Sequence, residues 1–196
     1  APWGPHEPGR AYNSMIYPLA PYPIKGALWY QGEGNTVNGQ HYARALSTLI
    51  QDWRSLWGID FSFYIAQIAP FAGYGTDNVS GAVIRDQQRK VLEMVPHTGM
   101  AVLSDIGDLK DIHPKNKVDV GKRLALWALN KDYNMKDMVF SGPAYSSFKI
   151  EGDKINILFD YAQGLYAKGG LLNEIEILTR DAKWISALAT VRDKTV

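Results

Sequence analysis

A short polar stretch follows an apolar segment near the start of this sequence. The apolar residues 25–30 give way to Gln31-Gly32-Glu33-Gly34-Asn35. In open α/β sheets, ligands bind just beyond the carboxyl ends of the strands. A turn of amides, glycines and a carboxylate at that place offers a substrate both side chains and free backbone N–H groups. We interpret it as one side of a candidate active site; the alternative is an ordinary solvated loop, since Gly and Asn also form turns.

One histidine stands out because carboxylates precede it. Asp105, Asp108 and Asp111 all lie shortly before His113. A general-base histidine needs a carboxylate or carbonyl on Nδ1, so that Nε2 is free to take a proton. Residues two apart in an extended segment point to the same side, so Asp111 is the first candidate partner, and a turn could instead bring back Asp108. The alternative for His113 is an ordinary residue at a helix start.

The other three histidines, His6, His41 and His97, are scattered along the chain and are more typical of capping or surface positions. Because no pair of histidines has the spacing of a metal site on a helix, we expect no metal. The sequence has no cysteine, which excludes disulfides and thiolate catalysis. We therefore expect a reaction without a cofactor.

A nucleophile is harder to find than a base. Ser14 is not preceded by the strand and tight turn that would expose a serine hydroxyl at the end of a sheet. Ser104, beside Asp105, is more typical of the last residue of a strand. The sequence thus contains a candidate general base but no evident serine nucleophile for that base to activate.

The elements that must position these residues follow a repeating pattern. Apolar segments and amphipathic stripes alternate, which predicts a parallel sheet with crossover helices and an α/β fold class. Unbroken apolar strands indicate that helices cover both sheet faces. The predicted strands are 25–30, 61–68 and 100–104, and the predicted helices are 38–57, 81–94 and 118–130.

The pattern changes near residue 140. Four short β-rich segments, separated by turn residues, predict an antiparallel unit; they are 145–150, 154–159, 174–178 and 184–191. Residues 194–196 would open another strand, so we expect this unit to be incomplete. The predicted domains are therefore 1–140 and 141–196.

The composition restricts the partners. Hydrophobic residues make up 46% and charged residues 21% of the 196 positions, as in a soluble globular domain. The formal net charge is +1 and the basic residues are dispersed, so we expect no nucleic-acid partner. No apolar stretch approaches the roughly 20 residues of a membrane helix, so we expect no membrane association. The sequence begins at Ala1 with a Pro-rich stretch, which suggests a part of a larger gene product.

Two blocks of the sequence resemble one family. The first block consists of residues 11–16, 18–19 and 24–35, and the second of residues 105–108, 111–114, 116–117 and 121–125. Together they resemble sialate O-acetylesterase-like proteins, which are carbohydrate esterases of the SGNH (GDSL-type) hydrolase superfamily. The resemblance implies a flavodoxin-like three-layer α/β/α fold, followed by a small antiparallel β-rich unit. It also implies removal of O-acetyl groups from sialic acid or another sugar by Ser-His-Asp acyl transfer.

The resemblance implies a role for each candidate residue. His113 would be the base, with Asp111 or Asp108 as its partner. Glu33 would be an active-site carboxylate. Contacts to the oxyanion or the substrate would come from Gln31, Gly32 and Asn35.

The sequence also departs from the family pattern. The family's nucleophile lies in a Gly-Gln-Ser-Asn motif on the first strand, and that motif does not occur here. Lys110 occupies the position three before His113, where many superfamily members have an aspartate. We therefore expect the C-terminal part of an esterase, inactive alone, with an incomplete sheet.

These expectations extend to the partners of the protein. The substrate would be an O-acetylated sugar, and a homodimer or a companion N-terminal fragment would cover the incomplete sheet. The protein would act in the periplasm or outside the cell of a bacterium. The alternative is a carbohydrate-binding or interaction module that has lost catalysis.

Overall fold

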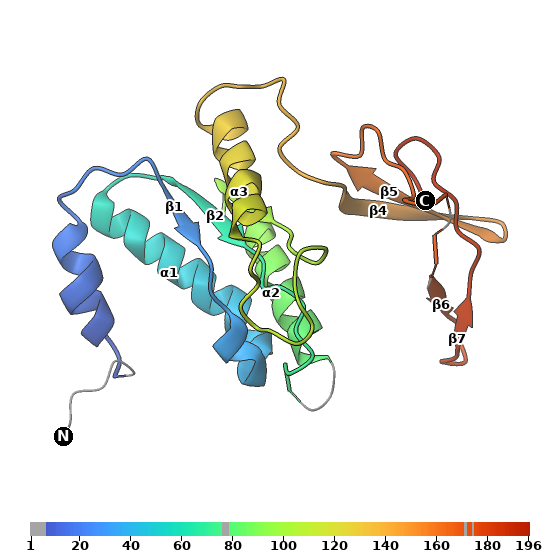
Figure 1. Cartoon of the computed structure of the whole chain (residues 1–196), viewed down its shortest axis with the longest axis horizontal. Coiled ribbons are helices and arrows are strands. Elements are labelled where there is room, and N and C mark those ends of the chain that lie inside the picture. Colours follow the sequence, from blue (N-terminus) through green and yellow to red (C-terminus); the bar gives the residue numbers. More distant parts are fainter. Residues whose placement is uncertain (1–6, 76–78, 171, 174) are drawn as a thin grey trace. The chain divides into compact units, whose positions relative to one another are not determined.

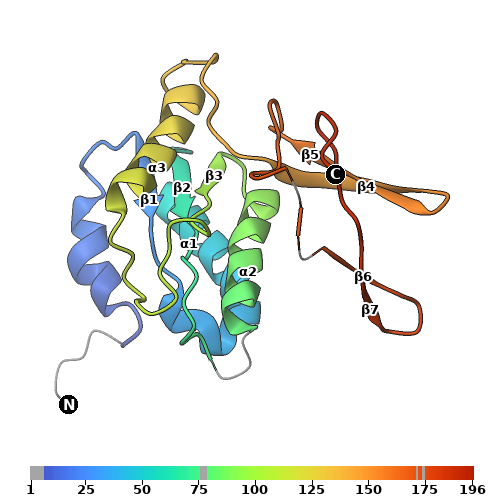
Figure 2. The ribbon, with the colours of Figure 1, turned by 45° about the vertical axis from the view of Figure 1, so that its right-hand side comes forward.

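The computed structural model describes residues 7–75, 79–170, 172–173 and 175–196. The chain forms two compact units, Ala1–Phe140 and Ser141–Val196. Figure 1 labels most of their helices and strands, and Figure 2 also labels β3. His6 and Glu174, the first residue of a predicted strand, lie outside the described residues.

The first unit contains a sheet of three parallel strands in the order β1-β2-β3, which confirms the predicted parallel sheet. β2 is central because it pairs with both neighbours, and four of its five residues are buried. An unbroken apolar strand is expected where both faces are covered. The strands are β1 (Gly26–Trp29), β2 (Ser62–Ala66) and β3 (Thr98–Ala101).

Helices cover both faces of this sheet, as Figure 2 shows. Phe63 and Ile65 of β2 belong to one apolar cluster with residues of α1 and α2. Tyr64 of β2 points to the opposite face and belongs to a second cluster with Trp127 of α3. This alternation follows from the two-residue period of a strand. The helices are α1 (Tyr42–Trp57), α2 (Ser80–Met94) and α3 (Lys117–Lys131), and the α/β/α layering confirms the predicted fold class.

Several predicted boundaries were wrong. The predicted helix 38–57 begins only at Tyr42, because a 3-10 segment, η3 (Glu33–His41), comes first and is interrupted by a non-helical Asn38. Strand 100–104 is shifted to β3, and strand 61–68 is shorter at both ends. Near the start of the chain, residues 12–19 form two short helical segments, η1 (Tyr12–Ile16) and η2 (Tyr17–Leu19).

The second unit contains two antiparallel pairs, which confirms the predicted pairing type. Gly152, with φ +64°, forms the turn of the first hairpin. The backbone of Val196 exchanges two hydrogen bonds with Ile157 of β5, at 2.7 and 3.0 Å. The predicted strand 184–191 ends at Ser186. The strands are β4 (Ala144–Glu151), β5 (Lys154–Asp160), β6 (Glu176–Leu178) and β7 (Trp184–Ser186).

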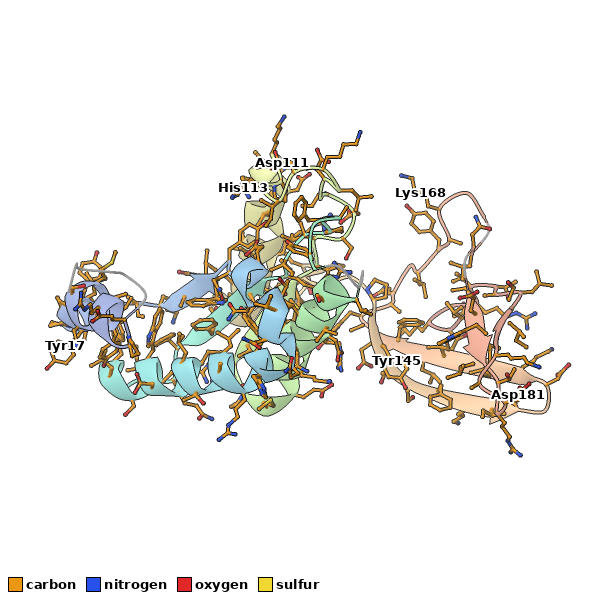
Figure 3. The ribbon with its side chains drawn as sticks, turned by 90° about the horizontal axis from the view of Figure 1, so that it is seen from below. Tyr17, Asp111, His113, Tyr145, Lys168 and Asp181 are labelled. Carbon is orange, nitrogen blue, oxygen red and sulfur yellow. The ribbon has the colours of Figure 1, made fainter. Side chains whose placement is uncertain are left out.

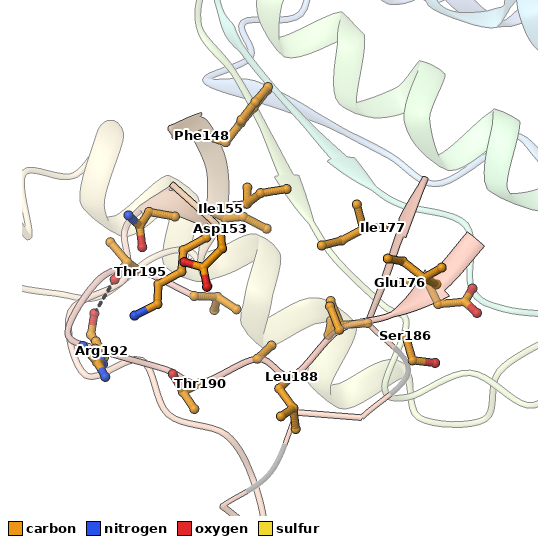
Figure 4. A pocket seen from close by; sticks show the side chains of 18 of the residues that line it. Phe148, Asp153, Ile155, Glu176, Ile177, Ser186, Leu188, Thr190, Arg192 and Thr195 are labelled. Atoms are coloured by element: carbon orange, nitrogen blue, oxygen red, sulfur yellow. Dashed lines mark hydrogen bonds between the residues drawn. The ribbon is translucent and has the colours of Figure 1, made fainter. Parts of the chain in front are cut away.

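The second unit also contains a cavity of about 730 Å³. Figure 4 shows apolar side chains of both strand pairs along its walls, among them Phe148, Ile155 and Ile177. Leu188 at its rim is fully exposed. The unit therefore has apolar surface that its own strands do not cover.

Membrane-spanning segments were searched for among the helices of the described residues. None of these helices combines the length and the apolar character needed to cross a bilayer.

Candidate active site

The two groups of candidate residues lie in loops that begin at the same edge of the sheet. Gln31 and Glu33 follow the carboxyl end of β1, and Asp111 and His113 follow the carboxyl end of β3. Parallel strands end at a common edge, and β2 lies between these two. The topology therefore places an amide-rich turn on one side of β2 and a histidine loop on the other.

Gln31 is fixed through both its backbone and its side chain. Its carbonyl oxygen accepts hydrogen bonds from the Tyr42 hydroxyl at 2.8 Å and from Gln88 Nε2 at 3.1 Å. Its side-chain Nε2 donates to Asn35 Oδ1 at 2.7 Å. Tyr42 is itself held, because Trp29 Nε1 donates to its hydroxyl at 3.0 Å. The bond from Gln31 uses Asn35 Oδ1, and Asn35 itself is exposed.

Gly32 must be a glycine for two reasons. Its φ of +148° is rare for residues with a side chain. A Cβ at this position would also lie 3.0 Å from Ile68 Cγ2 and 3.2 Å from Gln88 Nε2. The turn after β1 therefore has a backbone conformation that only glycine adopts without strain, and it directs the chain from the strand into η3.

Gln88 of α2 joins the backbone beyond two neighbouring strands. It is completely buried, and its Oε1 accepts a hydrogen bond from Ile68 N at 2.9 Å while its Nε2 donates to Gln31 O. Gln88 was not among the residues singled out from the sequence. The spacing of Gln88 from Ile84 and Val91, both buried, was the available signal.

Glu33 is half-buried at the start of η3. Burial raises the pKa values of Tyr30, Tyr42 and Tyr74, and the negative charge of Glu33 raises them further. The pKa of Tyr74 rises to about 12. These three phenols are therefore protonated at neutral pH.

Asp111 and His113 form a compact turn before α3, where both are labelled in Figure 3. Asp111 Oδ1 accepts a hydrogen bond from the backbone N–H of His113 at 2.9 Å and lies 3.8 Å from its Nδ1. The second distance is too long for a hydrogen bond. Catalytic hydrogen bonds are often loose in ligand-free enzymes and tighten in the substrate complex. The His113 side chain is 88% exposed, so the ring has room to adjust.

The other two aspartates of this loop have different partners. Asp108 Oδ1 accepts a hydrogen bond from the backbone N–H of Lys110 at 2.8 Å and so stabilises its own turn. Asp105 forms two hydrogen bonds with Arg123 of α3, at 2.6 and 2.7 Å, and these lower the pKa of Asp105. Of these three aspartates, Asp111 is thus the one that contacts His113. The Arg123 pairing had no signal in the sequence, because the two residues meet only after folding.

The serines considered above do not have the setting of a nucleophile. Ser14 lies in η1, and its hydroxyl donates to the carbonyl of Arg10 at 2.7 Å, as in an ordinary helical turn. Ser104 is exposed beyond the end of β3. Within the part of the chain that the structure describes, no serine hydroxyl forms a hydrogen bond with His113.

The structure brings together the members of each cluster but does not join the two clusters directly. Among the described residues, no hydrogen bond or ion pair links 31–35 with 111–113. In the same residues, no group of three or more acidic or histidine side chains could hold a metal ion. The arrangement offers a base with a carboxylate partner, and an amide-rich turn across the end of β2.

The chain resembles known acetylesterases. Residues 2–130 match the family described as carbohydrate esterase, sialic acid-specific acetylesterase. Sialate O-acetylesterases from Mus musculus and Homo sapiens are each 28% identical over 94% of this chain. The crystal structure of a carbohydrate acetylesterase from Xanthomonas citri matches with a TM-score of 0.84 and 35% identity, over 94% of this chain and 44% of that one. The chain spans only 38% and 39% of the mouse and human proteins.

Proposed function

Because this chain belongs to the family of sialic acid-specific carbohydrate acetylesterases, we propose that the complete protein removes O-acetyl groups from sialic acid or a related sugar. The observation that carries the proposal is the turn in which Asp111 contacts His113, at the same sheet edge as the Gln31 turn. A base and a set of amide donors at one edge are what acyl transfer requires.

In this proposal His113 is the general base. A serine hydroxyl attacks the acetyl carbonyl carbon and gives its proton to Nε2 of His113, while Asp111 faces Nδ1 and stabilises the imidazolium that forms. His113 then returns the proton to the sugar oxygen as the acetyl–oxygen bond breaks. Water releases acetate from the acetyl-serine in a second step with the same base. Asp108 remains the second candidate for the partner carboxylate.

The turn after β1 is the proposed oxyanion and substrate side. The backbone N–H of Gly32 and the amide N–H groups of Asn35 are the donors we assign to the developing oxyanion, with Gln31 holding Asn35 in place. Loss of one such donor costs about 3–4 kcal/mol of transition-state stabilisation. We assign Glu33 as an active-site carboxylate beside them.

The nucleophile belongs to another segment in this proposal. These 196 residues contain no Gly-Gln-Ser-Asn motif, and the relatives are more than twice as long as the part they share with this chain. We therefore propose that residues 1–140 are the C-terminal part of a hydrolase domain and that 141–196 belong to a β-rich domain. A bacterial source is supported by the higher identity to the Xanthomonas citri protein, and we place the enzyme in the periplasm or outside the cell.

The test compares the complete protein with residues 1–196 alone. We expect the complete protein to release acetate from an O-acetylated sialic acid, and residues 1–196 alone not to hydrolyse 4-nitrophenyl acetate. Hydrolysis by residues 1–196 that disappears in a Ser14→Ala variant would show that the nucleophile is misplaced. If the complete protein binds acetylated sugars but releases no acetate, it is a binding module.

A further inference from the structure

A lysine at the start of α3 contacts the strand end that leads into the Gln31 turn. Lys117 is the first residue of α3, and its Nζ lies over the Tyr30 ring, 4.7 Å from the centroid. Tyr30 comes between the last residue of β1 and Gln31. An ammonium within about 6 Å of an aromatic centroid is attracted to the face of the ring. In the described part of the chain no carboxylate forms an ion pair with Lys117, so this ring is the partner of its charge.

Tyr30 is held firmly on its other sides. It is half-buried and packs against the apolar cluster of β2 and α3, and its hydroxyl is buried. One residue later, the Gln31 carbonyl oxygen accepts hydrogen bonds from Tyr42 and Gln88. The ring and the backbone that follows it therefore form a fixed support for the ammonium of Lys117.

The link from Lys117 back to His113 is short and restrained. It consists of Pro114, Lys115 and Asn116. Pro114 is buried, and the ring of a proline fixes its φ. The backbone N–H of Lys117 donates to the carbonyl of Lys115 at 2.9 Å, and the side chain of Asn116 caps α3. A displacement of Lys117 should therefore displace the backbone of His113 as well.

His113 depends on such restraints because its own side chain is 88% exposed. On one side of it, Ile112 packs against the apolar cluster of α1 and α2. On the other side, Lys117 rests on Tyr30. In the described residues no hydrogen bond or ion pair joins 111–113 to 31–35 directly. The contact between Lys117 and Tyr30 instead connects the segments that flank these two groups.

We propose that Lys117 is a positioning residue, which sets the distance between the His113 loop and the Gln31 turn by resting on the Tyr30 ring. It acts through His113 and makes no contact with the substrate. This rests on the function proposed above, since a base and oxyanion donors must meet at the same acetyl group. A misplacement of about 1 Å can slow such a reaction about 10²-fold. Loss of the contact should therefore reduce turnover and leave substrate binding nearly unchanged.

The first experiment removes the charge of Lys117 in the complete protein. Lys117→Met keeps an unbranched side chain, and we expect kcat for an O-acetylated sialic acid to fall about tenfold, with KM within about twofold. The kcat for 4-nitrophenyl acetate should fall by about the same factor, because both esters use the same base and donors. Lys117→Arg should retain most of the activity, since a guanidinium also stacks on aromatic rings. An unchanged kcat in Lys117→Met, or a higher KM for the sugar ester alone, would overturn the proposal.

The second experiment asks whether Lys117 acts through the Tyr30 ring. Tyr30→Leu removes the ring, so adding Lys117→Met to this variant should change kcat by less than about twofold. Tyr30→Phe keeps the ring, and Lys117→Met should again cost about tenfold in that background. A tenfold loss on adding Lys117→Met to Tyr30→Leu would show that Lys117 acts independently of the ring, and the proposal would be wrong.

Lys131→Met is the matched control. Lys131 is the last residue of α3, and its Nζ lies 4.0 Å from the centroid of the Phe140 ring. The variant loses the same kind of contact from the same helix, at the opposite end from the His113 loop. It should keep kcat within about twofold of the wild type. Equal losses in Lys131→Met and Lys117→Met would indicate a general effect on α3 and would overturn the positioning role.

Failure of the proposed function can be recognised separately. If the complete wild-type protein hydrolyses neither ester, hydrogen exchange of the backbone amides in residues 111–117 replaces the kinetics. Lys117 is exposed, so Lys117→Met should fold normally. Exchange in this segment should be about tenfold faster in Lys117→Met and unchanged in Lys131→Met. Equal exchange in the wild type and Lys117→Met would overturn the positioning role whether or not the protein is an esterase.

Discussion

Asp111 has two contacts with the same residue, and this defines what the His113 turn can do. The carboxylate fixes the backbone of His113 through its N–H and faces the ring at 3.8 Å from Nδ1. A carboxylate on Nδ1 selects the tautomer that leaves Nε2 as a proton acceptor. The turn thus fixes the backbone of His113. A rotation of its side chain would be enough to bring Nδ1 within hydrogen-bond distance of Asp111.

His113→Ala in the complete protein should lower kcat by about 10³-fold or more, because the base is lost. The fold should be retained, since the side chain is mostly exposed. Kinetics with an acetylated sugar and far-UV circular dichroism measure the two effects.

His97→Ala is the control for this substitution. His97 precedes β3, at the opposite end of the strand, and its Nδ1 lies 2.9 Å from Asp60. This variant should retain nearly normal turnover. Comparable activity of the two variants would exclude His113 as the base.

At the scale of single residues, the sequence could indicate what lies close along the chain. Asp111 and His113 are neighbours in one loop, and Gln31 and Asn35 are neighbours in one turn, so their spacing was informative. Gln88, Tyr42 and Arg123 are far from their partners in the sequence, and only folding brings them together.

At the scale of elements, the turn between β1 and η3 depends on one glycine. Gly32→Ala should lower the free energy of unfolding by about 1–3 kcal/mol, because the alanine must adopt φ +148° and its Cβ meets Ile68 and Gln88. Urea denaturation measures this change.

Gly34→Ala provides the control two residues later. A Cβ at Gly34 meets no atom within 4 Å, so this variant should stay within about 0.5 kcal/mol of the wild type. Equal stability of the two variants would show that the conformation at Gly32 does not require glycine.

The loop after β3 is connected to α3 by the Asp105–Arg123 pair. The pKa of Asp105 is lowered in the folded state, so the pair stabilises the fold above the unfolded pKa of about 4 and loses this effect as the pH falls through the lower folded value. The stability difference between the wild type and Asp105→Asn should therefore be larger at pH 7 than at pH 3. Denaturation curves at both pH values measure it.

Asp52→Asn is the control for the pH experiment. Asp52 is exposed on α1 and forms no ion pair within the residues that the structure describes. Its substitution should give nearly the same small difference at both pH values. A pH-independent effect of Asp105→Asn would mean that the carboxylate contributes no charge interaction.

The elements themselves could be predicted where one face is apolar. Leu46 and Ile50 of α1 are buried at helical spacing, so the stripe identified the helix. The start of that helix was missed because η3 has almost no amphipathic pattern: its sequence is rich in Gly and Asn, which favour turns. Strand ends were missed because apolar residues such as Leu103 are buried in the loop beyond β3.

At the scale of the whole chain, apolar surface is left uncovered in each unit. Leu28 of β1 is 65% exposed, and β1 lies at one edge of the described sheet. The second unit has the cavity lined by Phe148 and Ile177. Open strand edges and apolar patches favour association. Residues 1–196 alone should therefore dimerise, or require a companion fragment.

Multi-angle light scattering on residues 1–196 tests this expectation, and coexpression with the preceding segment of the complete protein tests the companion. A stable dimer, or a complex with that segment, is the expected result. A well-behaved monomer across a range of concentrations would contradict it.

Gln88, a residue of α2, holds together the segments that follow β1 and β2. The backbone of β1 and that of β2 pair directly up to Trp29 and Ile65, and beyond them the carbonyl of Gln31 and the N–H of Ile68 are bridged by the amide of Gln88. This amide is a spacer of fixed length, anchored in α2. A displacement of α2 should therefore move the backbone at Gln31 and at Ile68 together.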